Sequence, residues 1–489
     1  MGSRKLRYAV IGAGMSGLLA GIKLLERGER ELVLFEKGHT VGGTWRENTY
    51  PGLACDTPAH SYTYSFAPNP DWSAYYAPGP EIQAYFEEMA DRYGVRPYIR
   101  FQTPVKACTW NPRKMRWQID TETGEREEAD VVIAATGVLH HPHIPDIPGL
   151  ADFRGRWWHS ARWDHSVDLG DKRVGVIGSG STGIQIVSAL AGRVRHLVHF
   201  QRTPQWIMPC TNPPYTEEDK RLFRQDPSRI EYVRNGPEAR ARRERFLAAI
   251  ADASSPQLAE LQQIVERHLE ESVRDPILRE KLRPNYTVAC KRLVFSWDYY
   301  EKIQQPGVTI EVAGIERVEG RGVRMRDGSF HPLDVLVLAT GFHADAFVRP
   351  MRVIGRDATD LEELWAEHPT AYYAVTIPRM PNFFLLNGPT GPVGNFSLIE
   401  IAERQWNYLD QLMELLRSGK ARAVEPTETA LADYEARRTE AARRTVFATG
   451  CKSWYLDRNG VPQVWPWSYE HFLEVMARPR LADYRLLDG

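Results

Sequence analysis

Two glycine-rich turns most constrain how this 489-residue chain can fold. Each turn follows a strand-like run, LRYAVIG or RVGVIG, and precedes apolar residues at helical spacing. The glycines are Gly12, Gly14 and Gly17 in the first turn and Gly178, Gly180 and Gly183 in the second. This spacing permits a tight turn, close approach of a pyrophosphate and close packing of helix on strand. It predicts two dinucleotide-binding βαβ units; the alternative is two glycine turns in an α/β protein that binds no nucleotide.

The residue that follows the second strand differs in charge between the two units. Glu36 and Arg202 lie equally far from the first glycine of their motifs. A carboxylate accepts hydrogen bonds from ribose hydroxyls and repels a 2'-phosphate, whereas an arginine pairs with that phosphate. We therefore expect FAD in the first unit and NADPH in the second. A solvent-exposed surface role for Arg202 is the alternative.

A near-repeat supports this doubling. DVVIAATG at 130–137 and DVLVLATG at 334–341 each predict a buried strand that ends in a glycine turn.

Between the second unit and the second repeat, residues 215–282 alternate acids and bases in patterns typical of amphipathic helices with a solvated face. The predicted fold is α/β, with two Rossmann-like dinucleotide-binding domains, for FAD and NADPH, and an inserted helical subdomain. The predicted boundaries are 1–140 plus 342–489 for FAD, 141–214 plus 283–341 for NADPH, and 215–282 for the insertion.

The composition of the chain argues against several classes of binding partner. A net charge of -1 and a pI near 6.9 give no field that attracts nucleic acid or an anionic membrane. The first apolar helix is too short to span a bilayer and is interrupted by Lys23. The five cysteines are scattered without a C-x-x-C pair, which predicts no disulfide framework, no structural zinc and a cytoplasmic location. The HHPH segment at 140–143 lacks clustered cysteine or acidic partners, so no metal is expected.

Two nucleotide-binding units in one chain imply hydride transfer between nicotinamide and flavin. Disulfide reductases need a redox dithiol near the flavin, and the chain has neither C-x-x-C nor C-x4-C. Oxygen is the remaining obvious electron acceptor.

Two further segments resemble the fingerprints of type I Baeyer-Villiger monooxygenases, a family within the flavin-containing monooxygenases. GGTWRENTYPGLACD at 42–56 matches [AG]-G-x-W-x4-[FY]-P-[GM]-x3-D at every fixed position. FRGRWWHSARWD at 153–164 matches F-x-G-x3-H-x3-W-[PD], with His159 and Trp163 at fixed positions. The resemblance implies an FAD- and NADPH-dependent enzyme that converts ketones to esters or lactones with O2 through a C4a-peroxyflavin.

The resemblance also implies roles for individual residues. Those expected at FAD, besides the first glycine motif and Glu36, are Gly43, Thr44, Trp45, Asp56, Tyr62 and Val105. Those expected at NADPH, besides the second glycine motif, are Ser181, Thr182, Arg202, Thr203, Lys291, Arg292 and Trp454. Lys291 is expected to contact the 2'-phosphate, and Trp454 to fold over NADP and substrate from a mobile loop.

Arg292 and Asp56 are the predicted catalytic residues. A fixed cation stabilises a peroxide anion and then the tetrahedral oxyanion formed on the ketone, and arginine stays charged when partly desolvated. A nearby carboxylate offsets the cost of burying that cation and aims it. A structural ion pair is the alternative. His159 is predicted to act in a hinge or coupling segment between the domains, where Trp157, Trp158 and Trp163 pack.

Two other functions remain open at this point. One is oxygenation mainly of sulfur or nitrogen; the other is an uncoupled NADPH oxidase or a redox-sensing flavoprotein. Heteroatom-oxidising relatives share the glycine motifs but normally carry another aromatic where this chain has Trp163. The expected partners are a small-molecule ketone, with sulfides as a second class, and O2. The expected assembly is a monomer or weak homo-oligomer.

Overall fold

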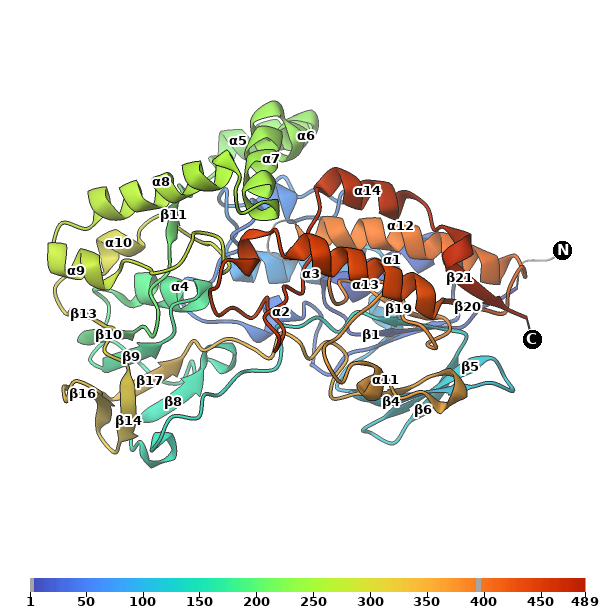
Figure 1. The fold of residues 1–489 in the computed structure, drawn as a ribbon, viewed down its shortest axis with the longest axis horizontal. Helices are drawn as coiled ribbons and strands as arrows, with labels where there is room; N and C mark the ends of the chain where they lie inside the picture. Colours follow the sequence, from blue (N-terminus) through green and yellow to red (C-terminus); the bar gives the residue numbers. More distant parts are fainter. Residues whose placement is uncertain (1–3, 393–396, 489) are drawn as a thin grey trace.

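The computed structural model describes residues 4–392 and 397–488, and the chain forms two halves that each contain a parallel sheet (Figure 1). The first sheet has the strand order β19-β7-β1-β2-β3, and all its neighbouring strands are parallel. Its strands are Tyr8–Ile11 (β1), Leu32–Phe35 (β2), Ile99–Arg100 (β3), Val131–Ala134 (β7) and Phe383–Leu385 (β19).

The second sheet repeats this arrangement with the order β13-β10-β9-β17-β8, again all parallel. Its strands are Arg156–His159 (β8), Arg173–Ile177 (β9), His196–Phe200 (β10), Val308–Glu311 (β13) and Val335–Leu338 (β17). The near-repeat strands occupy equivalent places, since β7 pairs with β1 and β17 pairs with β9.

Both faces of each sheet are covered, which explains why their central strands are continuously apolar. In β1, Tyr8 and Val10 face one core cluster while Ala9 and Ile11 face another. In β17, the two valines and the two leucines divide between opposite clusters in the same way.

Strand β8 places part of the second fingerprint in the second sheet, where the sequence predicts a hinge or coupling segment between the domains and no strand. Its residues pair with β17 and form an edge of the second sheet. Trp158 is buried and packs edge-to-face on Trp163, with ring centroids 5.6 Å apart, whereas Trp157 is exposed. RWWH has no alternation of apolar and polar residues, so only its neighbour β17 reveals that it is a strand.

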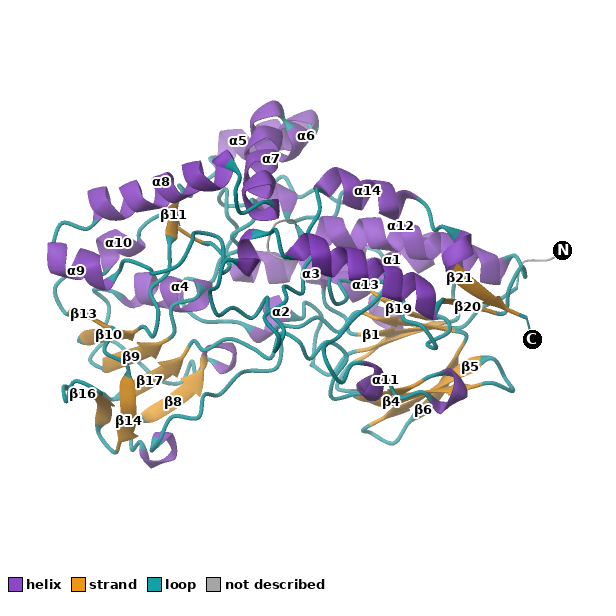
Figure 2. Cartoon of the chain, in the orientation of Figure 1, coloured by secondary structure: helices purple, strands orange, loops and turns teal. Residues whose placement is uncertain are grey.

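The principal helices follow the glycine turns or cover the first sheet (Figure 2). Each glycine turn leads into a helix, Met15–Glu26 (α1) or Ser181–Leu190 (α4). Helices Gly79–Arg92 (α3) and Leu398–Arg417 (α12) pack against α1. Two further helices lie near the C-terminus, Glu428–Ala442 (α13) and Tyr469–Ala477 (α14), and α14 packs against α12. Short helices are Thr44–Glu47 (α2), Tyr299–Lys302 (α10) and Leu361–Leu364 (α11).

The segment between the second unit and its closing strands is helical, as its charge pattern predicts. It comprises Glu217–Gln225 (α5), Ser228–Asn235 (α6), Pro237–Ala251 (α7), Pro256–Ser272 (α8) and Pro276–Lys281 (α9). Helices α5 to α8 lie along the top of the molecule in Figure 1, and α9 lies at its left end. Side chains of Thr216, Ser255 and Asp275 cap the starts of α5, α8 and α9. Leu258, Leu261 and other residues of α8 bury its apolar face in the core beside the second sheet.

Smaller sheets complete the fold. The order β18-β4-β5-β6 joins Arg352–Ile354 (β18), Val105–Asn111 (β4), Arg116–Thr121 (β5) and Arg126–Ala129 (β6). The others join Ile315–Glu319 (β14), Gly322–Met325 (β15) and Phe330–Pro332 (β16); Ile207–Pro209 (β11) and Val294–Ser296 (β12); and Ala423–Pro426 (β20) and Tyr484–Leu487 (β21). Across the described part of the chain, no helix has the length and apolar character needed to cross a membrane.

Candidate functional site

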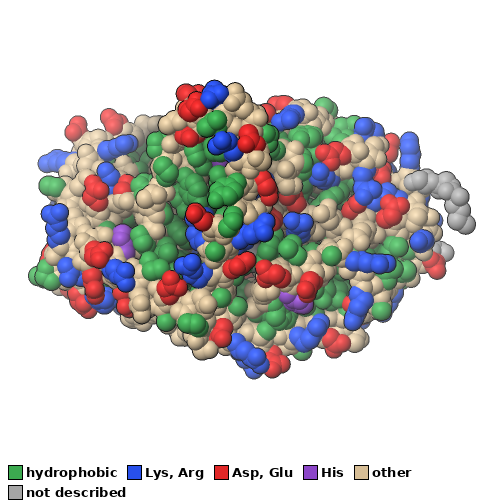
Figure 3. All heavy atoms as spheres, turned by 90° about the horizontal axis from the view of Figure 1, so that it is seen from above, with side chains coloured by type: hydrophobic (Ala, Val, Ile, Leu, Met, Phe, Trp, Pro, Cys, Tyr) green, Lys and Arg blue, Asp and Glu red, His purple; other side chains and the backbone are tan. Residues whose placement is uncertain are grey.

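A cavity of about 2200 Å³ lies where the two halves meet, and both glycine turns line it. Viewed from above, apolar side chains gather near the middle of the molecule while charged side chains are spread over the surface (Figure 3). Ligand pockets usually measure about 300–1,000 Å³. The larger volume here leaves room for two dinucleotides and a further small molecule.

The first glycine turn is too tight for side chains. Gly12 has φ +99°, and a Cβ there would lie 2.5 Å from the Ala135 carbonyl oxygen. Glu36 is buried at the end of β2, where its carboxylate accepts hydrogen bonds from the amides of Ala13 (2.9 Å) and Gly38 (2.7 Å). Arg46 also donates to it at 2.7 Å and balances its charge. This turn and carboxylate fit the pyrophosphate and ribose of FAD.

The second glycine turn has equivalent geometry. Gly178 has φ +120°, and a Cβ there would lie 2.1 Å from the Ala339 carbonyl oxygen. The buried Ser181 hydroxyl at the start of α4 has no hydrogen-bond partner among the described residues. Because a helix N-terminus also offers free amides, this turn fits a phosphate group.

Two cations beyond this turn lack an acidic partner. Arg202, just after β10, is exposed, and Lys291 lies over the Tyr286 ring at 4.6 Å. Neither forms an ion pair with any described residue. Burial lowers the pKa of Lys291, and the charge of Arg202 lowers it further. Two like charges without a counterion fit the 2'-phosphate of NADPH.

The two halves also contribute one ion pair to the cavity. Arg292, shortly before β12, donates from one nitrogen to both Asp56 carboxylate oxygens, at 2.8 and 2.7 Å. The charge of Asp56 raises the pKa of Arg292 above its ordinary value, so the guanidinium stays protonated. The Arg292 side chain remains 37% exposed and lines the cavity. The structure thus brings together the two predicted catalytic residues.

Other residues assigned by the family resemblance gather on the cavity wall. Gly43 opens helix α2 at φ +55°, and buried Trp45 donates from its indole to the Tyr62 hydroxyl at 3.1 Å. Val105 begins β4, and Trp454 is 49% exposed and packs on Tyr455 with ring centroids 4.1 Å apart. Thr44, Thr182 and Thr203 line the same cavity, whereas Gly17 and Gly183 are not part of its lining.

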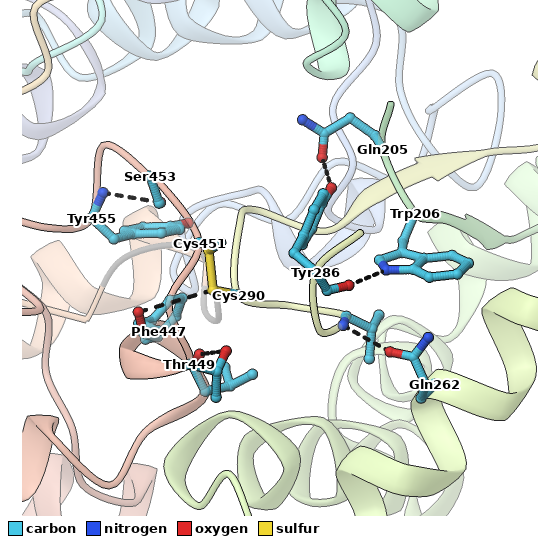
Figure 4. The surroundings of a disulfide bond; sticks show 12 residues. Gln205, Trp206, Gln262, Tyr286, Cys290, Phe447, Thr449, Cys451, Ser453 and Tyr455 are labelled. Atoms are coloured by element: carbon cyan, nitrogen blue, oxygen red, sulfur yellow. Dashed lines mark hydrogen bonds between the residues drawn. A yellow bond between two sulfur atoms is a disulfide. The ribbon is translucent and has the colours of Figure 1, made fainter. Parts of the chain in front are cut away.

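Cys290 and Cys451 form a disulfide, with Cα atoms 6.2 Å apart (Figure 4). The prediction that the scattered cysteines form no disulfide is wrong for this pair, although Cys55, Cys108 and Cys210 are free. The two residues are 161 positions apart and meet because the C-terminal loop folds back toward the second half. The cysteines therefore no longer support the predicted cytoplasmic location.

Sequence reasoning also missed Tyr455, whose hydroxyl interacts with the Arg292 guanidinium. It missed Arg46 at Glu36, and Phe246 and Leu261 of the helical insertion, which line the cavity. Tyr455 adjoins the predicted Trp454, which was the one available signal. For the insertion, nothing in the charge pattern indicates which face reaches the cavity.

Both ring nitrogens of His159 form hydrogen bonds within the protein. Its Nε2 lies 2.9 Å from the Gly341 carbonyl, and its Nδ1 accepts a hydrogen bond from the Ala161 amide at 3.1 Å. Donation from Nε2 and acceptance at Nδ1 require the neutral ring. Burial lowers its pKa to about 4, in agreement with that state. His159 therefore joins β8 to the turn after β17, and its hinge or coupling role stays a prediction.

The His159→Gln variant is expected to flatten the pH dependence of stability below neutrality. The unfolded chain binds a proton at this histidine near pH 6.5, but the folded chain only near pH 4, so the free energy of unfolding falls as pH drops through that window. Glutamine keeps one donor and one acceptor of similar reach but does not titrate. Urea unfolding from pH 4 to 8 checks this, with the exposed His39→Gln variant as control; an unchanged slope in His159→Gln would contradict it.

The Gly183→Ala and Gly180→Ala variants are expected to affect different properties, thermal stability in the first and NADP binding in the second. A Cβ at Gly183 would lie 2.0 Å from the Gly178 carbonyl oxygen, whereas a Cβ at Gly180 meets no atom within 4 Å. Gly183→Ala should therefore lower the melting temperature of the protein without NADP. Gly180→Ala should preserve it but weaken NADP binding, because the added methyl group faces the cavity. Calorimetry with and without NADP distinguishes the two, and equal melting temperatures for both variants would contradict the assignment.

Known proteins resemble this chain along most of its length. The flavin-binding monooxygenase-like family matches residues 5–215. A Baeyer-Villiger monooxygenase of Streptomyces coelicolor is 40% identical over 99% of this chain and 93% of its own, and an uncharacterized monooxygenase of Mycobacterium tuberculosis is 43% identical over 98% and 95%. The closed crystal structure of cyclohexanone monooxygenase aligns with a TM-score of 0.88, at 30% identity and full coverage of both chains. Cyclohexanone monooxygenase from Rhodococcus bound to NADP+ aligns equally well, with a TM-score of 0.88, 30% identity and 99% coverage of both chains.

Proposed function

We propose, on the premise that this chain belongs to the type I Baeyer-Villiger monooxygenases of the flavin monooxygenase superfamily, that Arg292 stabilises the negative charge that forms on oxygen during ketone oxidation. The protein is an FAD- and NADPH-dependent Baeyer-Villiger monooxygenase. Within that activity, the roles of individual residues are the proposal.

The bound cofactors supply the hydride and the activation of oxygen. Arg292 supplies a permanent positive charge at the cavity wall, because Asp56 raises its pKa. A preorganised cation of this kind stabilises an oxyanion on the attacked ketone carbon without reorganisation of solvent. Asp56 restrains the guanidinium, and the cation keeps donors free for the reacting oxygen.

One observation carries this proposal: the Arg292–Asp56 pair lines the same cavity as both glycine turns. Asp56 belongs to the half with the first sheet, and Arg292 to the half with the second. A pair placed there can face both the flavin and the nicotinamide ends of the bound dinucleotides. A purely structural ion pair would not need exposure to the cavity.

The cofactor contacts and domain boundaries form part of the same proposal. Glu36, Gly43, Tyr62 and their neighbours would hold FAD, and Ser181, Arg202 and Lys291 would hold NADPH. The proposed boundaries, 1–140 plus 342–489, 141–214 plus 283–341, and 215–282, keep the strands of each parallel sheet within one domain. Cytoplasmic location and a monomer or weak homo-oligomer also remain predictions.

A panel of cyclic, linear and aromatic ketones with NADPH and O2 tests the activity of the chain itself. We expect at least one ester or lactone that carries one added oxygen, detected by mass spectrometry. A panel of sulfides and amines runs in parallel, since sulfides are the second predicted substrate class. If sulfides or amines gain oxygen and no ketone does, heteroatom oxidation replaces the proposal. NADPH oxidation that yields only hydrogen peroxide with every substrate would favour an uncoupled oxidase.

A further inference from the structure

The C-terminal loop at 451–463 is covalently tied to the segment that carries Arg292. Cys290 directly precedes Lys291 and Arg292, and its disulfide partner Cys451 begins the loop (Figure 4). The bond links a cavity-lining pair of cations to a loop that also lines the cavity through Trp454 and Tyr455. The base of this loop therefore cannot move away from Arg292 while the disulfide is intact.

The loop is also ordered by its own hydrogen bonds. The Asp457 carboxylate accepts hydrogen bonds from the amides of Asn459 and Val461, both at 2.8 Å. The Gln463 amide donates to the Tyr455 carbonyl at 2.7 Å. These bonds close a hairpin that fixes the backbone of Tyr455.

The Tyr455 ring is buried at the cavity wall. It is 2% exposed and packs on Phe447, with ring centroids 4.6 Å apart. It lines the same cavity as Arg292, and its hydroxyl lies close enough to the guanidinium that each group shifts the pKa of the other, while Asp56 holds that guanidinium by hydrogen bonds. Burial raises the pKa of Tyr455, so the hydroxyl stays neutral and its oxygen can accept from a neighbouring cation.

We propose that Tyr455, kept in place by the Cys290–Cys451 disulfide, is a positioning residue for Arg292. Asp56 alone contacts one guanidinium nitrogen, which leaves the planar group free to rotate about that contact. A second contact from Tyr455 fixes its plane and directs the remaining donors into the cavity. This inference rests on the proposed role of Arg292. Small displacements of a charge-stabilising group lower the rate steeply, so the second contact affects oxygen transfer more than cofactor binding.

Tyr455→Phe tests the hydroxyl while keeping the ring. We expect the rate of ester formation to fall about tenfold, as for the loss of one hydrogen bond to a charged group, and more of the NADPH to end as hydrogen peroxide. Flavin content and anaerobic flavin reduction by NADPH should match the parent protein. If Tyr455→Phe leaves both the ester rate and the peroxide fraction unchanged, Tyr455 does not position Arg292.

The Cys290→Ser/Cys451→Ser double variant tests the disulfide, with Cys210→Ser as the matched control. Hydrogen exchange should become faster at 452–463 in the double variant only, and its peroxide fraction should rise as in Tyr455→Phe. Peptide mapping of the parent protein without reductant should yield the cross-linked Cys290 and Cys451 peptides. Absence of that cross-link, or unchanged exchange and coupling in the double variant, overturns the proposal.

The Arg292→Ala variant distinguishes a failure of the positioning role of Tyr455 from a failure of the proposed catalytic role of Arg292. If Arg292→Ala still forms ester at the parent rate, the catalytic role of Arg292 fails, and the positioning role with it. If Arg292→Ala loses ester formation while Tyr455→Phe and the double variant behave like the parent protein, only the positioning role fails. Loss of ester in Arg292→Ala together with uncoupling in the other two supports both.

Discussion

Replacing Arg292 with alanine is expected to abolish ester formation from ketones while NADPH still reduces the flavin. The guanidinium is the cation that Asp56 holds at the cavity wall, 2.7 Å from a carboxylate oxygen. Its loss removes the charge that stabilises an oxyanion, which costs about 3 kcal/mol or more of barrier, equivalent to a rate loss of at least about a hundredfold. Anaerobic stopped-flow absorbance reports flavin reduction, and mass spectrometry reports the ester.

Two variants control this result. Arg292→Lys keeps the charge but has fewer donors in a less rigid arrangement, so it should retain part of the activity. Arg240→Ala removes an exposed arginine of helix α7 and should behave like the parent protein. Ester formation by Arg292→Ala at the rate of the Arg240→Ala control would refute the assigned role.

The parts of the fold that could be predicted depend on local patterns. Continuous apolar strands such as β1 and β17 need both sheet faces covered, and their glycine turns need conformations that side chains cannot adopt. The charge at Glu36 or Arg202 is likewise visible beside its own motif. The near-repeat even predicted that β7 and β17 are equivalent, because each closes onto the first strand of its unit.

The missed features depend on contacts between distant residues. Strand β8 is defined by pairing with β17, and its own residues RWWH carry no strand periodicity. Cys290 meets Cys451, and Tyr455 meets Arg292, only after the C-terminal loop folds back over the second half. The Arg292–Asp56 pair is also long-range, yet it could be predicted because the family resemblance assigns a role to both positions. Physical reasoning from spacing alone would not have joined them.

The Arg202→Gln variant is expected to lose most of the preference for NADPH over NADH. Arg202 and Lys291 are neighbouring cations without an acidic partner in the described chain, so the 2'-phosphate would supply their counterion. Charge-assisted hydrogen bonds contribute about 1.5–3 kcal/mol each, so kcat/KM for NADPH should fall roughly tenfold to a hundredfold. NADH lacks this phosphate, and its kcat/KM should stay the same or rise slightly because one fewer cation must be desolvated.

The ratio of the two kcat/KM values is the decisive measurement, because a general loss of folding or flavin lowers both equally. Arg193→Gln, an exposed arginine after helix α4, is the matched control and should leave the ratio unchanged. The dependence on salt is a second test, because screening weakens exposed charge pairs. The NADPH preference of the parent protein should decline as ionic strength rises, and that of Arg202→Gln should decline less. If Arg202→Gln lowers both kcat/KM values by the same factor, Arg202 does not contact the phosphate, and Lys291 alone must account for any remaining preference.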